Sequence, residues 1–244
     1  MNIYRPITEK PKKGNPFYNT KSAGGVNPCI TGKPKQDGLT VLCNCVGYGV
    51  GRFNEAAGQS DCTLLGSTNA ENFIELAIKQ GLKVTSDPYV GGLMVWSKGK
   101  VGDGSDGAGH VAFCERIIYR SDKPVVISSE SGYNSFAFQI RERSGKNWSQ
   151  GRTYTYLGTI INPKVVPPVT RPAVTLRFGS IGEEVKWLQW MLNAHGYECG
   201  EIDGVFGRKT RNAVGLYQRD NGLFVDHCVG RMTKDALVRG FYYV

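Results

Sequence analysis

Apolar residues recur at helical spacing in two segments of the first half of the chain. Between positions 46 and 57 they fall at i, i+4, i+7 and i+11, which predicts a helix over residues 45–57 with one apolar face. Three glycines in this segment lower its intrinsic helix propensity but would allow close packing. A second helix is predicted over 69–80, because residues 68–71 have the spacing of a capping box and Gly81 is well placed to end the helix.

The pattern then changes to one of strands. Five segments rich in Val, Ile, Phe and Tyr, separated by short Gly, Ser or Asp loops, predict strands at 93–96, 110–118, 125–129, 136–143 and 153–161. Helices followed by a run of strands are typical of an α+β domain with an antiparallel sheet. Residues 1–40, which glycine and proline interrupt every few positions, are predicted to be irregular.

Four prolines between positions 163 and 172 favour an extended, semi-rigid linker. Beyond them, three amphipathic stripes predict three short helices, and a glycine-bounded turn at 203–207 places Phe206 where it can fill a small core. We therefore expect an N-terminal domain at 1–162, a proline-rich linker at 163–173 and an all-α three-helix module at 174–244.

Charge and composition narrow the classes of function. The chain has 244 residues, of which 40% are hydrophobic, and a net charge of +9, most of it in the N-terminal part. A basic balance attracts polyanions, but the chain has no helix-turn-helix, zinc-finger or aromatic RNA-binding signature, so nucleic-acid binding is disfavoured. No apolar run is long enough to span a membrane, and the first residues lack the apolar segment of a secretory signal.

The cysteines and histidines argue against a zinc protein. Seven cysteines without CxxC spacing and three dispersed histidines predict mostly reduced thiols and no zinc site. Asp103 and Asp106 have the spacing of a cation loop, for which a divalent ion such as calcium is the candidate ligand and a solvated turn is the alternative. No other cofactor is expected.

Cys45 stands where a nucleophilic thiol is expected. It begins the helix predicted at 45–57, and the free N–H groups and dipole of a helix start favour a thiolate and can stabilise an oxyanion. Asn44, directly before it, is a candidate on the oxyanion side. Two alternatives stay open, in which Cys45 is a small buried apolar residue or Cys43 is the nucleophile.

His110 and Glu130 complete a candidate triad. His110 opens the strand at 110–118, and Glu130 follows the end of the next predicted strand, so a hairpin would bring its carboxylate to the imidazole. A carboxylate there would fix the imidazole tautomer and favour the imidazolium. The alternative is that His110 is a core histidine with all its hydrogen bonds satisfied.

These residues lie in three motifs that resemble those of the CHAP family: Asn-Cys-Val-Gly-Tyr at 44–48, Gly-His-Val-Ala at 109–112 and Ser-Glu-Ser-Gly-Tyr-Asn at 129–134. The resemblance, which residues 25–30 and 92–96 extend, covers about residues 15–160. It implies a papain-like fold and a cysteine-dependent amidase or endopeptidase acting on bacterial cell wall. In that family's scheme Cys45 is the nucleophile, His110 the general base and Glu130 the orienting group. Trp96 and Tyr133 are candidates for contacting substrate.

The resemblance is not complete. Family members often carry Asn two residues after the acidic residue, and this chain has Gly132 there, so Asn134 is the candidate substitute. The chain also resembles the NlpC/P60 hydrolases, a neighbouring papain-like family. The Asn44-Cys45 pair and the Glu130 motif favour CHAP.

The C-terminal module resembles peptidoglycan-binding domain 1. The matching positions are Gly179-Ser180, Gly182, residues 185–189, 192–193 and 196–197, Gly200, the turn at 203–207, Thr210, residues 213–214 and 217–218, and Val229-Gly230 with Thr233. The resemblance implies a non-catalytic module that holds wall peptidoglycan and keeps the catalytic site near its substrate.

The two resemblances together predict a bacteriophage endolysin, made in the host cytoplasm without a signal peptide and acting, as a monomer with antimicrobial effect, on Gram-positive peptidoglycan. A secreted housekeeping autolysin is one alternative. A wall-binding protein with a degenerate cysteine-hydrolase scaffold is another, and a nucleic-acid binder that uses the basic face is a third.

Overall fold

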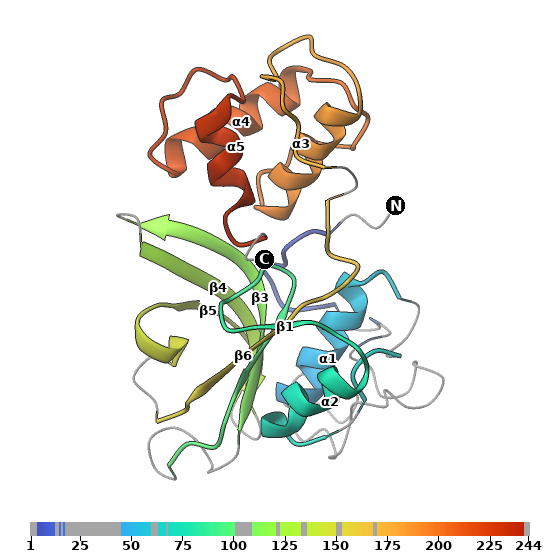
Figure 1. Cartoon of the computed structure of the whole chain (residues 1–244), viewed down its shortest axis with the longest axis vertical. Coiled ribbons are helices and arrows are strands. Elements are labelled where there is room, and N and C mark those ends of the chain that lie inside the picture. Colours follow the sequence, from blue (N-terminus) through green and yellow to red (C-terminus); the bar gives the residue numbers. More distant parts are fainter. Residues whose placement is uncertain are drawn as a thin grey trace.

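An antiparallel sheet of six strands, two helical segments beside it and three further helices make up the computed structural model (Figure 1). The structure describes residues 4–12, 15, 17, 45–59, 63–66, 68–100, 109–120, 123–132, 136–149, 153–167 and 170–241. The strand order is β1-β6-β2-β3-β4-β5, and every neighbouring pair runs antiparallel. The predicted fold class, α+β with an all-α three-helix part, is confirmed.

The elements follow the predicted order along the chain. They are α1 (Cys45–Ala56), the 3-10 turn η1 (Ala70–Asn72), α2 (Phe73–Lys79), β1 (Val84–Thr85), β2 (Leu93–Trp96), β3 (His110–Arg120), β4 (Lys123–Gly132), β5 (Phe136–Arg143), the 3-10 turn η2 (Lys146–Trp148), β6 (Tyr156–Ile160), α3 (Glu183–Ala194), α4 (Arg208–Asp220) and α5 (Arg231–Val238). All five predicted strands are present. The unpredicted β1 has two residues, too few to show an alternating pattern.

The second predicted helix differs from expectation at its start. The segment begins as η1 and becomes α-helical only at α2. Its cap is Asn69, not Thr68, the first residue of the predicted box, and Asn69 makes no side-chain capping hydrogen bond. The capping-box prediction is therefore wrong. Glu71, which would have closed the box, instead accepts a hydrogen bond from the backbone N–H of Gly109 and pairs with Lys98 at 3.2 Å.

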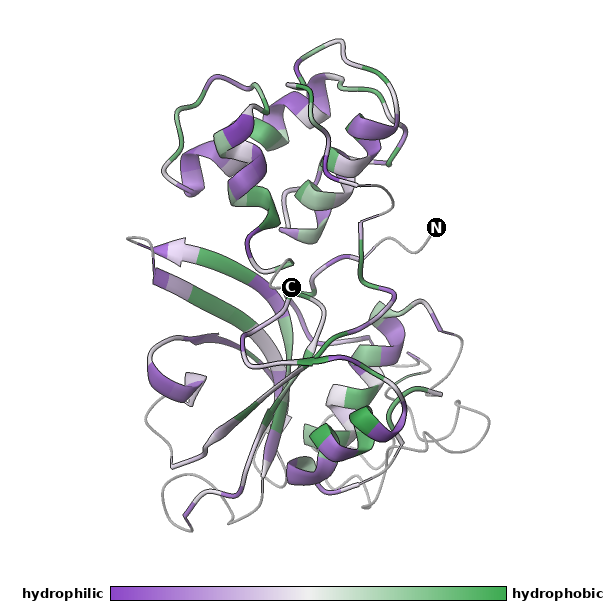
Figure 2. Ribbon diagram, in the orientation of Figure 1, coloured by the Kyte–Doolittle hydropathy of each residue, from purple (hydrophilic) through white to green (hydrophobic). Residues whose placement is uncertain are grey.

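Helix α1 lies against one face of the sheet, where it contacts β3 and β4, and its ribbon carries apolar stretches (Figures 1 and 2). Gly49 explains why glycines are used in this helix. A Cβ at that position would lie 2.9 Å from Cδ1 of Leu93 and 3.0 Å from Cγ2 of Val111. The missing side chain thus lets the helix approach the sheet closely, as the sequence suggested. This close packing brings the start of α1 toward His110, the first residue of β3.

A buried charge cluster ties α1 to the sheet. Glu115, which is fully buried at an irregularity of β3, accepts hydrogen bonds from Arg52 of α1 at 2.8 and 2.9 Å. The hydroxyls of Tyr4 and Ser129 donate to the same carboxylate at 3.0 and 2.6 Å. The Arg52 guanidinium also lies over the ring of Phe113, 5.0 Å from its centre. A buried charge is tolerated here because every charged atom has several partners.

The three C-terminal helices contain two turns that are built alike. Gln189 of α3 donates to Asp203, to the Val205 carbonyl and to Thr210 at 2.7–3.3 Å. The equivalent bonds in the second turn run from Gln218 of α4 to Asp226, the Cys228 carbonyl and Thr233, at 2.8–3.2 Å. In both turns a left-handed residue, Gly204 or His227, donates its N–H to the glutamine side-chain oxygen. Phe206 is 1% exposed, so the predicted filling of the small core is confirmed.

The helical part also packs against the sheet-containing part. The Val90 N–H donates to the Gly240 carbonyl at 3.0 Å, and the Phe241 ring meets the rings of Tyr89 and Trp190 edge-on. Arg239 lies over the ring of Tyr119, 5.2 Å from its centre. These contacts seat the end of α5 on the last residues of β3 and on the loop that leads into β2 (Figure 1).

The proline-rich segment is held at both of its ends. Val165 is fully buried and packs directly against Gly91. A Cβ on residue 91 would lie only 2.4 Å from Cγ1 of Val165, so position 91 has no room for a side chain. At the other end, the ammonium of Lys234 donates to the carbonyls of residues 172, 173 and 174 at 3.0, 2.9 and 3.1 Å. The described ends of this segment are thus fixed to the two parts that they join.

Candidate functional site

The site lies where the first turn of α1 meets the start of β3. Cys45 is the first residue of α1 and is half-buried. Its side chain hydrogen-bonds the imidazole of His110, the first residue of β3. The helix contributes the free N–H groups of its first turn at this point, and these groups and the helix dipole favour negative charge.

Glu130 of β4 binds the other side of the imidazole. Strands β3 and β4 pair with Phe113 opposite Ser129, and this register brings Glu130 to the level of the ring. Nε2 of His110 meets Oε2 of Glu130 in a short contact. Since each ring nitrogen has one bonding direction, Nδ1 is left for the thiol of Cys45. The hydrogen bonds thus form a chain from thiol to imidazole to carboxylate, which is the order that the sequence predicted.

Two arginines of β5 surround the carboxylate of Glu130. Nη2 of Arg143 lies 2.7 and 2.6 Å from its two oxygens, and Nε of Arg141 lies 3.1 Å from Oε1. Burial alone would raise the pKa of Glu130, but the charge of Arg143 and the hydrogen bond with His110 lower it to about 2. Glu130 is therefore ionised at any pH at which the protein would work.

The environment of His110 favours its charged form. Burial by itself lowers the pKa of the imidazole, but the hydrogen bonds with Cys45 and Glu130 outweigh burial and raise the pKa above its ordinary value. The ring lies parallel to the ring of Tyr154, with centres 5.9 Å apart, and beside the indole of Trp96 at the same distance. These flat neighbours hold the imidazole plane in the direction that both hydrogen bonds need.

A turn after β5 supports the site from beneath, and the sequence pattern did not reveal it. The Trp148 carbonyl accepts a hydrogen bond from Arg143, and the Asn147 carbonyl accepts one from the Trp96 indole, at 2.9 and 2.8 Å. Asn147 and Trp148 both have left-handed backbone angles, with φ of 61° and 52°. Such angles cost about 1–3 kcal/mol for residues other than glycine and tend to occur at functional sites.

Gly109, directly before His110, has no room for a side chain. A Cβ there would lie 2.8 Å from the Glu71 nitrogen, 2.8 Å from the Trp96 carbonyl oxygen and 2.9 Å from a Glu71 side-chain oxygen. Because two of these atoms belong to the backbone, neither can turn away. The glycine therefore lets η1 and β2 close around the start of β3.

We expect Gly109→Ala to lower the free energy of unfolding by about 1–3 kcal/mol, since overpacking forces the backbone apart. His110 would be displaced as well, so the rate at which iodoacetamide alkylates Cys45 should fall more than the loss of folded protein explains. Thermal unfolding, and alkylation at a temperature where the variant is folded, would measure both effects. Gly66→Ala is the matched control, because nothing lies within 4 Å of the Cβ it would add. Equal behaviour of the two variants would contradict the role given to Gly109.

Several candidate residues lie outside the described part of the chain. They are Asn44, Cys43, Asp103, Asp106, Tyr133 and Asn134. Trp96, a candidate for contacting substrate, is described and is fully buried. Its contacts are with His110, the turn at Asn147 and the guanidinium of Arg143, which lies 4.5 Å from the ring centre. In this structure Trp96 thus supports the site from below.

The described residues contain no group of three or more His, Cys, Asp or Glu side chains that could hold a metal ion. Within the same residues, no helix is both long and apolar enough to cross a membrane. Cys114 and Cys199 are buried, and burial raises the pKa of each thiol, that of Cys199 to about 12. These two thiols are therefore poor candidates for a nucleophile.

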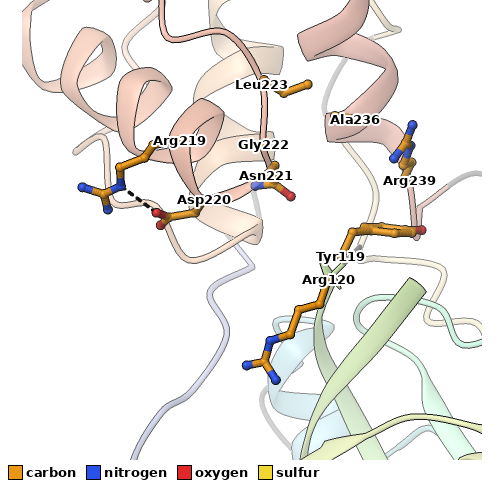
Figure 3. Close-up of a pocket in the computed structure, with 9 residues that line it drawn as sticks. All are labelled: Tyr119, Arg120, Arg219, Asp220, Asn221, Gly222, Leu223, Ala236 and Arg239. Carbon is orange, nitrogen blue, oxygen red and sulfur yellow. Dashed lines mark hydrogen bonds and ion pairs between the residues drawn. The ribbon is translucent and has the colours of Figure 1, made fainter. Parts of the chain in front are cut away.

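A cavity of about 550 Å³ lies at the opposite end of β3 from His110, between the sheet and the C-terminal helices (Figure 3). Tyr119 and Arg120 line it from β3, and residues 219–223, Ala236 and Arg239 line it from the helical part. Two of its arginines are already paired, Arg120 with Glu142 and Arg219 with Asp220. It is separate from the cysteine site and belongs to the contact between the two parts.

Two segments of the chain match known protein families. Residues 34–132, which include Cys45, His110 and Glu130, match the CHAP domain. Residues 181–237 match the peptidoglycan binding domain, and they include all of α3, all of α4 and all of α5 except Val238. The first segment carries the site and the second carries the helical part.

Individual relatives are similar to part of this chain. The spore cortex-lytic enzymes of Oceanobacillus iheyensis and Bacillus cereus are each 42% identical to it over 65 residues, and that of Bacillus subtilis is 37% identical over 87 residues. These matches cover 27%, 27% and 35% of this chain and 24%, 25% and 28% of the three enzymes. The chain thus spans about a quarter of the length of the curated relatives that it matches.

Solved structures add two similarities. One is the crystal structure of the SleB N-terminal domain, 37% identical, covering 29% of this chain and 96% of that one, with a TM-score of 0.28. The other is a peptidoglycan-binding protein from Clostridioides difficile in complex with glutamine hydroxamate, 26% identical, covering 48% of this chain and 72% of that one, with a TM-score of 0.26.

Proposed function

From the CHAP domain and the peptidoglycan-binding domain that this chain carries, we propose that it is a peptidoglycan hydrolase that cleaves an amide bond of the bacterial cell wall. The observation that supports this most is the hydrogen-bonded chain from Cys45 through His110 to Glu130. A thiol, a base and a group that orients the base are the three parts that cysteine-dependent acyl transfer requires.

The reaction would proceed in two steps. His110 takes the proton of Cys45, and the thiolate attacks the carbonyl carbon of the amide. The tetrahedral oxyanion would form near the first turn of α1, which begins at Cys45 and whose free N–H groups would donate to it. His110 then gives its proton to the leaving amine, and the C–N bond breaks to leave a thioester on Cys45.

Water completes the cycle. His110 takes a proton from a water molecule, which attacks the thioester, and the free thiol is restored as the acid product leaves. Glu130 remains ionised throughout and stabilises the imidazolium without accepting its proton. The helical part supplies affinity for the insoluble polymer and no reacting group. None of these steps uses a cofactor.

The bacteriophage endolysin remains our more specific proposal for the biological role, with peptidoglycan of Gram-positive cells as the substrate. The supporting features are the pairing of a CHAP domain with a peptidoglycan-binding domain and the similarity of part of the chain to spore cortex-lytic enzymes. A secreted autolysin would use the same chemistry and would differ in its source.

The proposal is tested by incubating the protein with purified Gram-positive peptidoglycan and analysing the soluble fraction. We expect soluble fragments with new amino termini, and their masses would identify the bond that is cut. If the protein sediments with the wall but releases no fragment, it is a wall-binding protein with an inactive scaffold. Salt-sensitive retention of DNA without sedimentation would instead indicate a nucleic-acid binder and would contradict the proposal.

A further inference from the structure

Arg143 makes more contacts around the site than its place on β5 requires. Its guanidinium donates to both oxygens of Glu130, to Oγ of Ser128 at 3.0 Å and to the Trp148 carbonyl at 2.9 Å. One face of the guanidinium lies over the Trp96 ring. The side chain is 3% exposed, so the structure has placed a full positive charge in the interior.

The positive charge of Arg143 keeps the buried carboxylate of Glu130 ionised. This carboxylate is fully buried, and a buried carboxylate without a partner becomes protonated. A protonated Glu130 would lose the charge that stabilises the imidazolium of His110. The imidazolium cannot secure that charge by itself, because His110 is neutral in part of its catalytic cycle.

The planar guanidinium also fixes the direction of the carboxylate. With Nη2 bonding both oxygens and Nη1 and Nε bonded elsewhere, Arg143 cannot rotate without breaking several bonds. Oε2 is thereby held toward His110. Arg141 adds charge near Oε1 at 3.1 Å, and its side chain is about a quarter exposed, whereas that of Arg143 is buried.

We propose that Arg143 is a positioning residue for the cysteine site, which acts through Glu130 by keeping this carboxylate charged and aimed at the imidazole. The proposal rests on the proposed cysteine hydrolase. It adds a fourth residue to the Cys45–His110–Glu130 series, taken from β5 and outside the three sequence motifs.

The charged or titratable groups that face Glu130, among the described residues, are His110 from β3 and Arg141 and Arg143 from β5. Cys45 meets the imidazole from α1 on its other side. Removal of the Arg143 charge therefore leaves Glu130 with Arg141 and the imidazolium alone. The carboxylate would then take up a proton at a higher pH than in the wild type.

The test is the rate at which iodoacetamide alkylates Cys45 as a function of pH, in the full-length protein. Fragment-ion mass spectrometry of the tryptic peptide over residues 36–52 separates Cys45 from Cys43. In Arg143→Met we expect the acid limb of this profile to move upward by about one pH unit or more. The acid limb of wall hydrolysis should move with it, and its rate at neutral pH should fall about 10- to 100-fold.

The variant Arg143→Lys separates the effect of the positive charge from the effect of the orientation of the Glu130 carboxylate. Lysine keeps the positive charge but cannot bond both oxygens and the Trp148 carbonyl in one plane. We expect its acid limb to stay within about 0.3 pH units of the wild type, a small change for an unaltered charge, while the hydrolysis rate falls about 3- to 10-fold.

A matched control uses the other buried pair of the same sheet. The single variant Arg52→Met removes an arginine of similar burial that does not contact His110 and leaves the Glu115 carboxylate without its charged partner. It should lower stability and leave both acid limbs in place. This control distinguishes a general weakening of the sheet from an effect on the imidazole.

The proposal is overturned if the Arg143→Met profile overlays the wild type once the folded fraction is corrected for. It is equally overturned if the methionine and lysine variants shift the limb alike, because charge would then not be the cause. Alkylation profiles as expected, together with no release of wall fragments by the wild type, would sink the proposed function and leave the role of Arg143 intact.

Discussion

Replacing Cys45 by alanine is expected to lower the rate of peptidoglycan solubilisation by at least about 10⁴-fold, because removal of the nucleophile from an acyl-transfer triad eliminates the covalent route. The alanine should fold normally, since Cys45 begins α1 and is only half-buried. Release of soluble fragments from purified wall, followed over hours, gives the range needed to measure such a loss.

Two controls make this result specific. Cys228→Ala removes a half-buried thiol from the helical part and should keep full activity. Sedimentation with wall should be the same for wild type and Cys45→Ala, because the helical part is unchanged. Equal hydrolysis by the Cys45→Ala variant and the wild type would refute the cysteine mechanism, whatever the wall binding.

Replacing Arg52 by methionine is expected to lower the free energy of unfolding of the sheet-containing part by about 3–5 kcal/mol. Among the described residues, the change leaves the fully buried carboxylate of Glu115 with the neutral donors from Tyr4, Ser129 and the Ile7 N–H. Methionine preserves most of the apolar stem that packs beside Phe113, so the loss reports the missing charge.

The double variant Arg52→Met/Glu115→Gln should recover most of this stability, because neither charge is then buried alone. Hydrogen exchange of the β3 and β4 amides measures the stability of this part separately from that of the C-terminal helices. A single variant as stable as the wild type, or a double variant no better than the single, would show that the pair is not the source of stability.

The proximity of Cys45, His110 and Glu130 could be predicted from sequence because each of them stands at or near the start or end of a regular element. Cys45 begins α1 and His110 begins β3, and Glu130 lies near the end of β4. The periodicity of a helix and the alternation of a hairpin suffice to place such residues. The core position of Phe206 followed in the same way from the turn around it.

The supporting residues could not be predicted, since their contacts depend on diagonal register and irregular backbone. Arg143 is paired across the ladder with Val126 and reaches Glu130 only by crossing it obliquely. Glu115 meets Arg52 because β3 is irregular there, and no alternation rule anticipates that. The turn over η2 requires left-handed backbone angles at Asn147 and Trp148, and the sequence around these two residues did not indicate such angles. The capping box at Glu71 does not form for a similar reason, because the Glu71 side chain bonds the Gly109 N–H and Lys98 instead.

Under the proposed function, the seating of the C-terminal helices on the far end of β3 would limit which bonds of the wall reach Cys45. Ile117, which contacts Gly240, lies seven residue steps along β3 from His110, which is roughly 23 Å at about 3.3 Å per residue. If the helical part binds wall while it is seated in this way, the bond that reaches Cys45 lies at a fixed distance from the bound wall site. A flexibly linked binding module would allow cuts at any bond within its reach, whereas this arrangement would produce cuts with a preferred spacing.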